Sequence, residues 1–340
     1  MHMADALLSP AVGGGMWAVT AGLIGVSSRK MRLEFQESRI PLMGVTGAFV
    51  FAAQMINFTI PATDSSGHIG GGLLLAILLG PWAGFLVTAS VLVIQALFFA
   101  DGGLLALGCN VFNLGFWTCF IAYPFIYKPI AGSKLRRGRI FLGCLLGAVV
   151  GLQLGAFSVV LETTLSGITD LPFGTFLLAM QPIHLAIGIV EGLVTAAVVL
   201  FVYEARPQVL SMQEQSGSSK LSAGFIAMVL LVAAIFIGGA LSLLASEHPD
   251  GLEWSMSKTA GTEELDTPEG IHESLARVQE KTAILPDYGY KVNDELQDPA
   301  VTGTTVSGLA GAFLTLIIAS GIGFLLKMRT RKILNTNSCG

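Results

Sequence analysis

Residues 71–100 read Gly-Gly-Leu-Leu-Leu-Ala-Ile-Leu-Leu-Gly-Pro-Trp-Ala-Gly-Phe-Leu-Val-Thr-Ala-Ser-Val-Leu-Val-Ile-Gln-Ala-Leu-Phe-Phe-Ala. The stretch is too long for one ordinary helical crossing of a bilayer, which needs about 20 apolar residues. Gly80-Pro81 in its middle is typical of a helix end. We therefore expect two crossings here, at about 70–80 and 82–100. A single long tilted helix is the alternative.

The composition of the whole chain is that of a membrane protein. Of its 340 residues, 53% are hydrophobic and 12% are charged, and the mean hydropathy is +0.70. A soluble domain carries roughly 25% charged residues. We expect a multi-pass protein of the inner cell membrane, surrounded by the lipid bilayer and without a nucleic-acid partner. The first ten residues hold no Lys or Arg, so we expect no removable signal peptide.

Apolar runs and basic clusters together predict the topology. The runs are 12–28, 40–60, 71–100, 105–127, 139–160, 173–203, 222–245 and 304–327. Lys and Arg mark cytoplasmic loops, and they gather after the first run, after the fourth run and at the end of the last. The number of crossings between the first two clusters must be even, so 71–100 has to count twice. The sequence predicts an all-α polytopic membrane helix bundle of about nine transmembrane helices, seven plus two, with the N-terminus outside and the C-terminus cytoplasmic.

The chain divides into two apolar regions. Residues 1–203 form the predicted seven-helix region, residues 204–221 are a polar, Ser-rich cytoplasmic linker, and residues 222–340 carry the last two helices. The polar segment 246–303 between those two helices holds thirteen Asp or Glu against four Lys or Arg, and the parity count places it outside. Two interpretations of this segment stay open. It is an ordinary solvated loop, or it gathers divalent cations or docks on the first seven helices.

The first two residues can chelate a metal ion. The Met1 amine and the His2 amide nitrogen close a five-membered ring on a metal, and the His2 amide nitrogen and imidazole Nδ1 close a six-membered ring. Three nitrogens can therefore lie in one plane, which favours Cu(II) or Ni(II). A histidine that stands near the start by chance is the alternative.

His68 is the candidate for a fourth nitrogen. It follows Ser66-Gly67 and precedes Ile69-Gly70. Because the neighbouring glycines have no side chains, other parts of the backbone can approach closely and the imidazole stays accessible. The predicted topology places His68 outside, on the same side as Met1 and His2. The three residues together would complete a square-planar site, although a lone loop histidine is more often only solvated.

Other polar residues have weaker claims. Asn57 and Gln54 precede the His68 loop and could hydrogen-bond to a ligand, although hydrogen bonding between helices is the simpler interpretation. His184 and Glu191 lie two turns apart on one face of an apolar run and form a possible intramembrane polar relay or a packing pair. Asp101 and Asn110 flank the next outer loop and are interpreted as ordinary caps. His248 and His272, in the segment 246–303, could hand over metal, but solvated histidines are the simpler interpretation.

Residues 1–203 resemble a known transporter family. Met1 to Pro10, Phe51 to Phe58, Ser66-Gly67-His68 and Gly72 to Trp82 are similar to the CbiM/NikM substrate-binding (S) components of cobalt and nickel energy-coupling-factor transporters. In the tail, residues 222–340, two motifs resemble the small CbiN/NikN component, which is fused here to the same chain. They are Pro249-Asp-Gly-Leu-Glu253 and Pro286-Asp-Tyr288. The resemblance implies that Met1, His2 and His68 bind the metal through nitrogens, and that the N-terminal segment dips into the bundle.

The expected function is import of Ni(II) or Co(II) as substrate, with no cofactor and no enzymatic activity. The sequence holds no Gly-x-x-x-x-Gly-Lys-Ser/Thr phosphate loop, so the energy would come from partners. The resemblance implies a membrane T component and cytoplasmic ABC-type ATPase subunits. By the same resemblance, the fused tail favours nickel. The alternatives are a Co(II) importer for cobalamin synthesis and a proton-coupled secondary metal transporter that uses His184 and Glu191. No His-Glu-x-x-His pattern supports a metalloenzyme.

Overall fold

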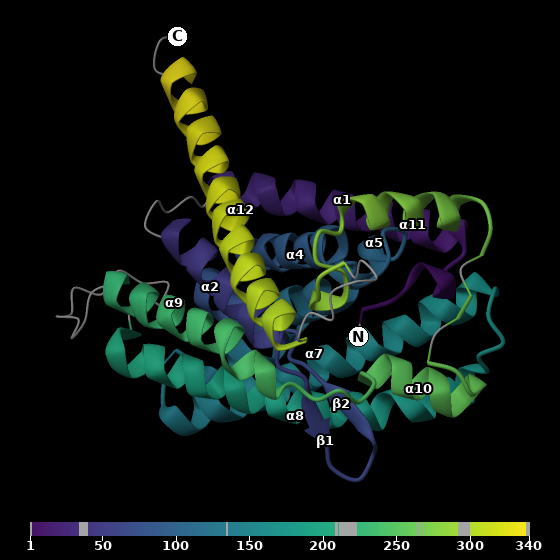
Figure 1. Cartoon of the computed structure of the whole chain (residues 1–340). Helices are drawn as coiled ribbons and strands as arrows, with labels where there is room; N and C mark the ends of the chain where they lie inside the picture. Colours follow the sequence, from purple (N-terminus) through teal and green to yellow (C-terminus); the bar gives the residue numbers. More distant parts are fainter. Residues whose placement is uncertain are drawn as a thin grey trace.

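The computed structural model describes residues 2–33, 40–133, 135–207, 210, 223–263, 265–266, 268–291 and 300–337. Apart from one short hairpin, the described residues form a bundle of helices (Figure 1). Its elements, in chain order, are η1 (Asp5–Leu7), α1 (Pro10–Leu33), α2 (Ile40–Gln54), β1 (Phe58–Ile60), β2 (Ser65–Gly67), α3 (Gly72–Leu79), α4 (Pro81–Phe98), α5 (Leu107–Val111), the π-helical η3 (Phe112–Tyr127), α6 (Lys128–Ala131), α7 (Arg137–Ser166), α8 (Phe173–Ala205), α9 (Ala223–Gly239), η5 (Leu241–Leu244), α10 (Gly251–Ala260), α11 (Ile271–Thr282), η6 (Pro286–Tyr288) and α12 (Ala300–Asn337).

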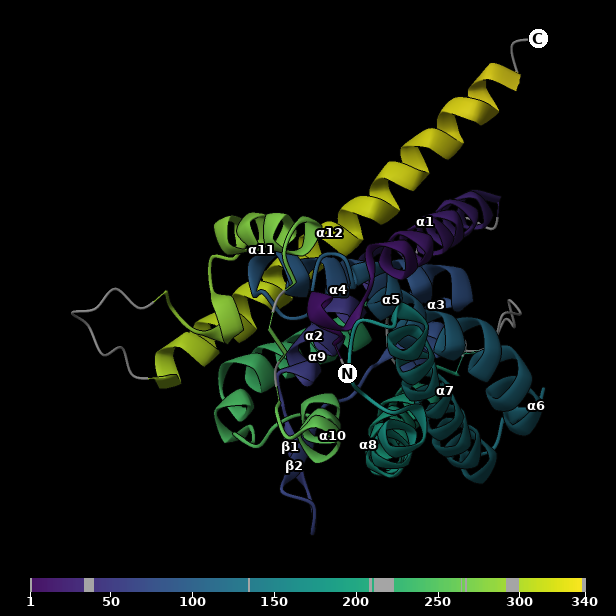
Figure 2. The same cartoon turned by 90° about the vertical axis from the view of Figure 1, so that its right-hand side faces the viewer.

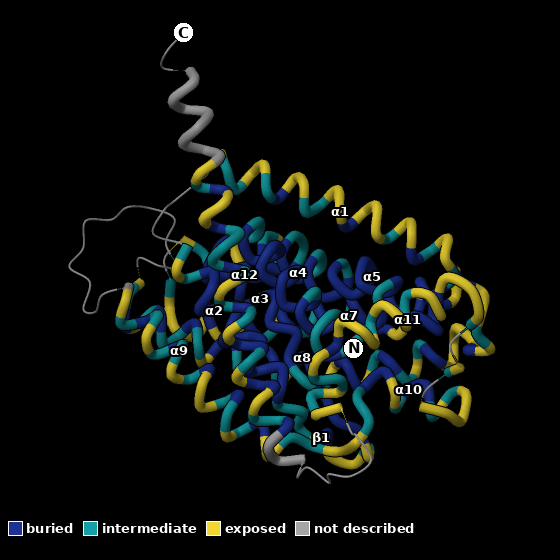
Figure 3. Tube along the Cα trace, turned by 45° about the horizontal axis from the view of Figure 1, so that its top comes forward, coloured by how far each residue is buried: buried dark blue, intermediate teal, exposed yellow. Residues whose placement is uncertain are grey.

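The chain is a multi-pass membrane protein, as the sequence predicts. Six helices in the described residues are long and apolar enough to cross a bilayer, and α2 and the stretch Gly224–Gly239 are shorter apolar helices. The six are Pro10–Leu33, Pro81–Phe98, Leu107–Ala131, Arg137–Ser166, Phe173–Ala205 and Gly303–Met328. Helix α4 lies in the buried core, whereas α1 exposes most of its length (Figure 3). The count of nine crossings and the sidedness stay predictions, as does the domain division. Most of the predicted linker 204–221 falls outside the described residues.

The predicted break in the run 71–100 is confirmed. Helix α3 ends at Leu79, Gly80 takes φ 86°, and Pro81 begins α4 at a position where a missing backbone N–H costs nothing. The two helices pack closely against each other at Gly84, where an added Cβ would lie only 2.8 Å from the Ala76 backbone nitrogen. At 1.5 Å per residue, α3 is only about 12 Å long. A crossing at this point would therefore have to include non-helical residues in front of it.

The acidic segment between the last two apolar helices is docked on the bundle in its described part, so the solvated-loop interpretation is wrong there. Helix α10 packs along α8, and α11 packs against α4 (Figure 2). A capping box starts α10, with the Asp250 carboxylate accepting from the backbone N–H groups of Leu252 and Glu253. The His272 Nε2 donates to the Leu8 carbonyl at 2.8 Å, and the side chain is 3% exposed. His272 is therefore a buried structural contact and not a solvated histidine.

Small residues let the tail helices approach each other and the first region. A Cβ on Gly308 of α12 would collide with the Gly238 backbone of α9, and a Cβ on Gly311 would collide with the Phe51 ring of α2. Close backbone approach at glycine is the usual way in which membrane helices pack. The tail helices are thus held by steric fit to α2 and to each other.

We expect Gly308→Val to loosen this packing. The added methyl groups have no space, and overpacking of this kind costs about 1–3 kcal/mol. The thermal unfolding midpoint of the solubilised chain should fall. Gly321→Val on the same helix is the matched control, because a Cβ there meets nothing within 4 Å. Equal midpoints for the two variants would contradict the assignment of Gly308 to the contact.

Candidate metal site

The hairpin β1–β2 and the glycines behind it place His68. Phe58 pairs with Gly67 in antiparallel register, so the chain turns back toward the bundle immediately before His68. Gly67 packs so closely on α8 that a Cβ would lie 2.5 Å from Ile187 Cγ1. Gly71, the N-cap of α3, has φ 76°, a backbone conformation that residues other than glycine rarely adopt. The predicted all-α bundle is correct apart from this hairpin.

Buried side chains satisfy the backbone that follows His68. The Glu191 carboxylate accepts from the Gly70 N–H at 2.7 Å and from the Gly71 N–H at 3.1 Å. Gln54 Nε2 donates to the Gly70 carbonyl at 2.9 Å, and Gln95 Nε2 donates to Gln54 Oε1. The loop is therefore fixed from both sides by hydrogen bonds in a region where unpaired backbone groups are costly.

The N-terminal segment enters the bundle and is clamped there. Met3 is fully buried, its N–H donates to Asn110 Oδ1 at 2.8 Å, and its carbonyl accepts from Asn110 Nδ2 and the Gly103 N–H. The Asp5 carboxylate accepts from the Ala106 N–H at 2.9 Å. Met1, the first of the predicted ligands, lies outside the described residues. The clamp on Met3 fixes the position of its neighbour His2.

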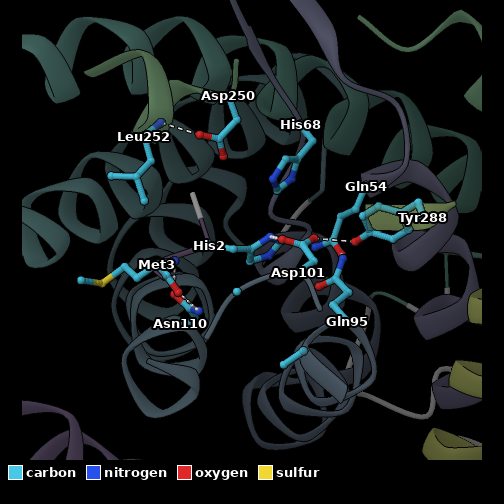
Figure 4. A network of polar contacts seen from close by, with 12 residues as sticks. His2, Met3, Gln54, His68, Gln95, Asp101, Asn110, Asp250, Leu252 and Tyr288 are labelled. Carbon is cyan, nitrogen blue, oxygen red and sulfur yellow. Dashed lines mark hydrogen bonds and ion pairs between the residues drawn. The ribbon is translucent and has the colours of Figure 1, made fainter. Parts of the chain in front are cut away.

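His2 and His68 lie side by side although they come from separate segments. Their ring centroids are 5.0 Å apart and the rings are inclined by 22° (Figure 4). His68 Nδ1 lies 3.1 Å from the Ile69 carbonyl, which can only accept, so Nδ1 carries the hydrogen and Nε2 keeps a free lone pair. Burial, reinforced by the charge of His2, lowers the pKa of His68 to about 3. The imidazole is thus in the neutral form that binds metals.

The other ring is engaged by a carboxylate. His2 Nδ1 lies 2.8 Å from Asp101 Oδ1, and Tyr288 of the tail donates to Asp101 Oδ2 at 2.5 Å. Burial alone would raise the pKa of Asp101, but the charge of His2 and the hydrogen bonds from His2 and Tyr288 outweigh it and hold that pKa below its usual range. Asp101 is therefore ionised and forms a true ion pair when His2 is protonated.

The tail also binds β2, the strand that ends immediately before His68. The Ser66 N–H donates to the Pro249 carbonyl at 2.8 Å, and the Ser66 hydroxyl donates to the His248 carbonyl at 2.8 Å. The Ser246 N–H donates to the Asn57 carbonyl at 2.7 Å. The tail thus contacts the first region both next to His68, through Ser66, and next to His2, through Asp101.

The two histidines line an acidic cavity of about 470 Å³. Its carboxylates come from both parts of the chain, and no Lys or Arg belongs to its described lining. The titratable side chains of that lining are His2, His68, His248, Asp5, Asp101, Asp250, Glu253, Glu263, Asp287 and Tyr288. A concave surface of one charge raises the local concentration of cations. Among the described residues, no three His, Cys, Asp or Glu side chains converge to hold a metal ion. The predicted ligand plane needs only two such side chains, His2 and His68, because the terminal amine and a backbone amide supply its other two nitrogens.

The cavity brings some of the predicted residues together and leaves others apart. Gln54 and Asn57 line it with the two histidines, whereas His184 and Glu191 do not. The His184 Nδ1 donates to the Met180 carbonyl at 2.8 Å inside its own helix. The relay between His184 and Glu191 stays a prediction.

Sequence reasoning missed four contributors to this region. Asp101 and Asn110 are not ordinary caps, because the first pairs with His2 and the second clamps Met3. Asp250 and Tyr288 reach the cavity from the tail. The sequence contained one signal for Asp250 and Tyr288, because both belong to the tail motifs that resemble the small component. Nothing in the spacing of these motifs connects them with His2.

The chain is similar to metal transport proteins over nearly its whole length. Residues 2–209 match the family profile described as the cobalt uptake substrate-specific transmembrane region, and residues 224–328 match the PDGLE domain. The putative fused nickel transport protein NikMN of Archaeoglobus fulgidus is 32% identical over 97% of this chain and 99% of its own. The probable fused nickel transport protein LarMN of Lactiplantibacillus plantarum is 30% identical over 97% of both chains.

A solved structure is similar to part of the chain. The crystal structure of a truncated transition metal transporter superposes with a TM-score of 0.53 at 33% sequence identity, and the match covers 60% of this chain and 99% of that one. The range matched by the family profile, residues 2–209, includes both His2 and His68.

Proposed function

Because the chain belongs to the family of cobalt uptake substrate-specific transmembrane regions and carries a PDGLE domain behind it, we propose that it is the substrate-binding membrane subunit of an ATP-driven importer of Ni(II) or Co(II). The metal ion is its cargo. A membrane T component and cytoplasmic ABC-type ATPase subunits would supply the energy, since the sequence itself holds no phosphate loop of the Walker type.

The observation that carries this proposal is the meeting of His2 and His68 in one acidic cavity. The proposed ligands are the Met1 amine, the His2 amide nitrogen, His2 Nδ1 and a His68 nitrogen. His68 Nε2 is the candidate, because Nδ1 faces the Ile69 carbonyl. Four nitrogens in a plane suit Ni(II) and close the plane to further reaction, which favours binding over catalysis. The cavity carboxylates would gather hydrated divalent cations from outside before the nitrogens take over.

Release would follow from the chemistry of the amide ligand. A backbone amide binds the metal only after it loses its proton, so the affinity is linked to proton release. Reorientation of the loaded subunit by its partners, followed by reprotonation or distortion of the plane, would weaken the binding and free the ion on the cytoplasmic side.

A competition experiment tests the cargo. We expect the purified chain with its native N-terminus, offered equal Ni(II) and Co(II), to retain nickel in excess and to show the d–d absorption of a planar complex. The same chain stripped with a chelator gives the baseline. Equal retention of both metals would remove the nickel preference and leave the cobalt alternative. Retention of neither would contradict the proposal as a whole.

A further inference from the structure

One carboxylate links the tail to the proposed metal ligand His2. Asp101 Oδ1 lies 2.8 Å from His2 Nδ1, and Asp101 Oδ2 accepts from the Tyr288 hydroxyl at 2.5 Å (Figure 4). His2 belongs to the N-terminal segment, Asp101 to the turn after α4, and Tyr288 to the tail. The orientation of the His2 ring therefore depends on a residue of the fused segment.

The backbone around Tyr288 is strained in a way that this contact explains. Asp287 has φ 48° and ψ 34°, and Tyr288 has φ 59°. Side-chain-bearing residues adopt this left-handed region only when their surroundings impose it. Here the Asp287 N–H donates to the Phe99 carbonyl at 2.8 Å, and the Tyr288 ring stacks on the Phe99 ring at 4.9 Å. The strained turn directs the Tyr288 hydroxyl at Asp101.

The tail also holds the turn that carries Asp101. The backbone N–H groups of Ile284 and Leu285 donate to the Phe98 carbonyl, each at 3.1 Å. Gln279 Nε2 donates to the Gly102 carbonyl at 2.7 Å and to the Ala96 carbonyl at 2.9 Å. The Asp101 carboxylate is therefore fixed both through its own oxygen and through the backbone on either side of it.

This arrangement is incompatible with a loaded plane. Nδ1 is the His2 nitrogen that would close the six-membered chelate ring with the residue's own amide, and in this structure it faces Asp101. The His2 and His68 rings are also stacked face to face, so they do not direct two nitrogens at one point between them. Loading therefore requires His2 to leave Asp101 and turn.

We propose that Asp101 competes with the metal for His2 Nδ1, and that Tyr288 is the positioning residue that keeps Asp101 in place for this competition. The proposal rests on the proposed function of His2 as a ligand. The ion pair keeps the unloaded His2 ring ordered at the site and adds a barrier to loading. The fused tail thereby sets the rate at which the site accepts its ion.

An opposite role for Asp101 makes the proposal testable. Carboxylates often support a metal-bound histidine by accepting from its other ring nitrogen. If that were the main role of Asp101, its removal would weaken or slow loading. Competition predicts the reverse, with the planar site of the loaded chain unchanged.

The experiment follows the growth of the planar absorption band after the full chain with its native N-terminus is mixed with Ni(II). We expect Asp101→Asn to load about tenfold faster than wild type with the band unchanged, because Asn keeps an acceptor oxygen but loses the charge that roughly doubles the strength of the hydrogen bond. Tyr288→Phe, which keeps the ring stacked on Phe99, should load faster by a smaller factor. The double variant should be no faster than Asp101→Asn, because both residues act through one carboxylate.

Two matched controls remove the same chemical groups at other positions in the chain. Asp170→Asn removes an exposed carboxylate from the loop between α7 and α8, and Tyr290→Phe removes a hydroxyl from a partly exposed ring two residues beyond Tyr288. Both should load at the wild-type rate. Loading of Asp101→Asn at or below the wild-type rate, or independent effects of the two substitutions, would overturn the inference. Absence of the band in wild type would overturn the proposed function, and the inference with it.

Discussion

A short Gly-Ser extension placed ahead of Met1 is expected to abolish planar metal binding and metal uptake. The extension converts the terminal amine into an amide and removes it from the first chelate ring. The metal affinity should fall by more than about 100-fold, beyond the loss that follows from disturbing groups that only support a ligand. The absorption band and the retained metal measure binding, and uptake in cells with the partner subunits measures transport.

The control for this extension is the same sequence added after Gly340, which should leave binding and uptake intact. The clamp on Met3 makes the test specific, because Asn110 and Gly103 hold the segment by hydrogen bonds that the extension does not change. His68→Ala is expected to lose the band as well, whereas His248→Ala, in the same cavity, should keep it. Full uptake by the extended chain would contradict the chelate.

The positions of the helices along the chain were largely predictable, because they follow from local signals. Gly80-Pro81 has the chemistry of a helix end, and the structure breaks the run there. The hairpin before His68 was not foreseen, since its strands have three residues each and carry no alternating pattern. The docking of the acidic segment was only one of two open interpretations, because acidity alone does not distinguish a solvated loop from a docked one.

The candidate site was predictable in its histidines and not in its carboxylates. The topology argument placed His2 and His68 on one side of the membrane, and the structure places them in one cavity. Asp101 reaches His2 only because the tail fixes the turn after α4, and such a contact depends on packing between segments far apart in the chain. No spacing in the sequence encodes it.

Substitution of Glu191 is expected to lower the metal affinity by about 10–100-fold, the range found when groups that orient a metal-binding histidine are removed. Glu191→Ala leaves the Gly70 and Gly71 N–H groups without their acceptor, at a cost of about 1–3 kcal/mol for each buried donor. The loop can then relax and carry His68 away from the plane. Glu191→Gln keeps one acceptor oxygen and should lose less. Competition against a metal-binding dye measures the affinity.

The matched control for Glu191 is Glu204→Gln on the same helix. Glu204 is exposed and its ion pair with Arg137 is at the surface, where such pairs contribute little. The affinity and the thermal midpoint should both stay at the wild-type values. An unchanged affinity in Glu191→Ala would contradict the role of this carboxylate in holding the His68 loop.

The same variants separate the proposed subunit from a proton-coupled transporter. In the proton-coupled case, Glu191→Gln and His184→Gln would both leave the affinity unchanged and abolish uptake by this chain alone under an imposed proton gradient. The contacts favour a different outcome. Glu191 is hydrogen-bonded to the loop behind His68, whereas His184 is hydrogen-bonded to the Met180 carbonyl of its own helix. Among the described residues, the structure records no hydrogen bond between the two side chains. We therefore expect only Glu191→Gln to lower the affinity, and we expect no proton-driven uptake in wild type without the partner subunits.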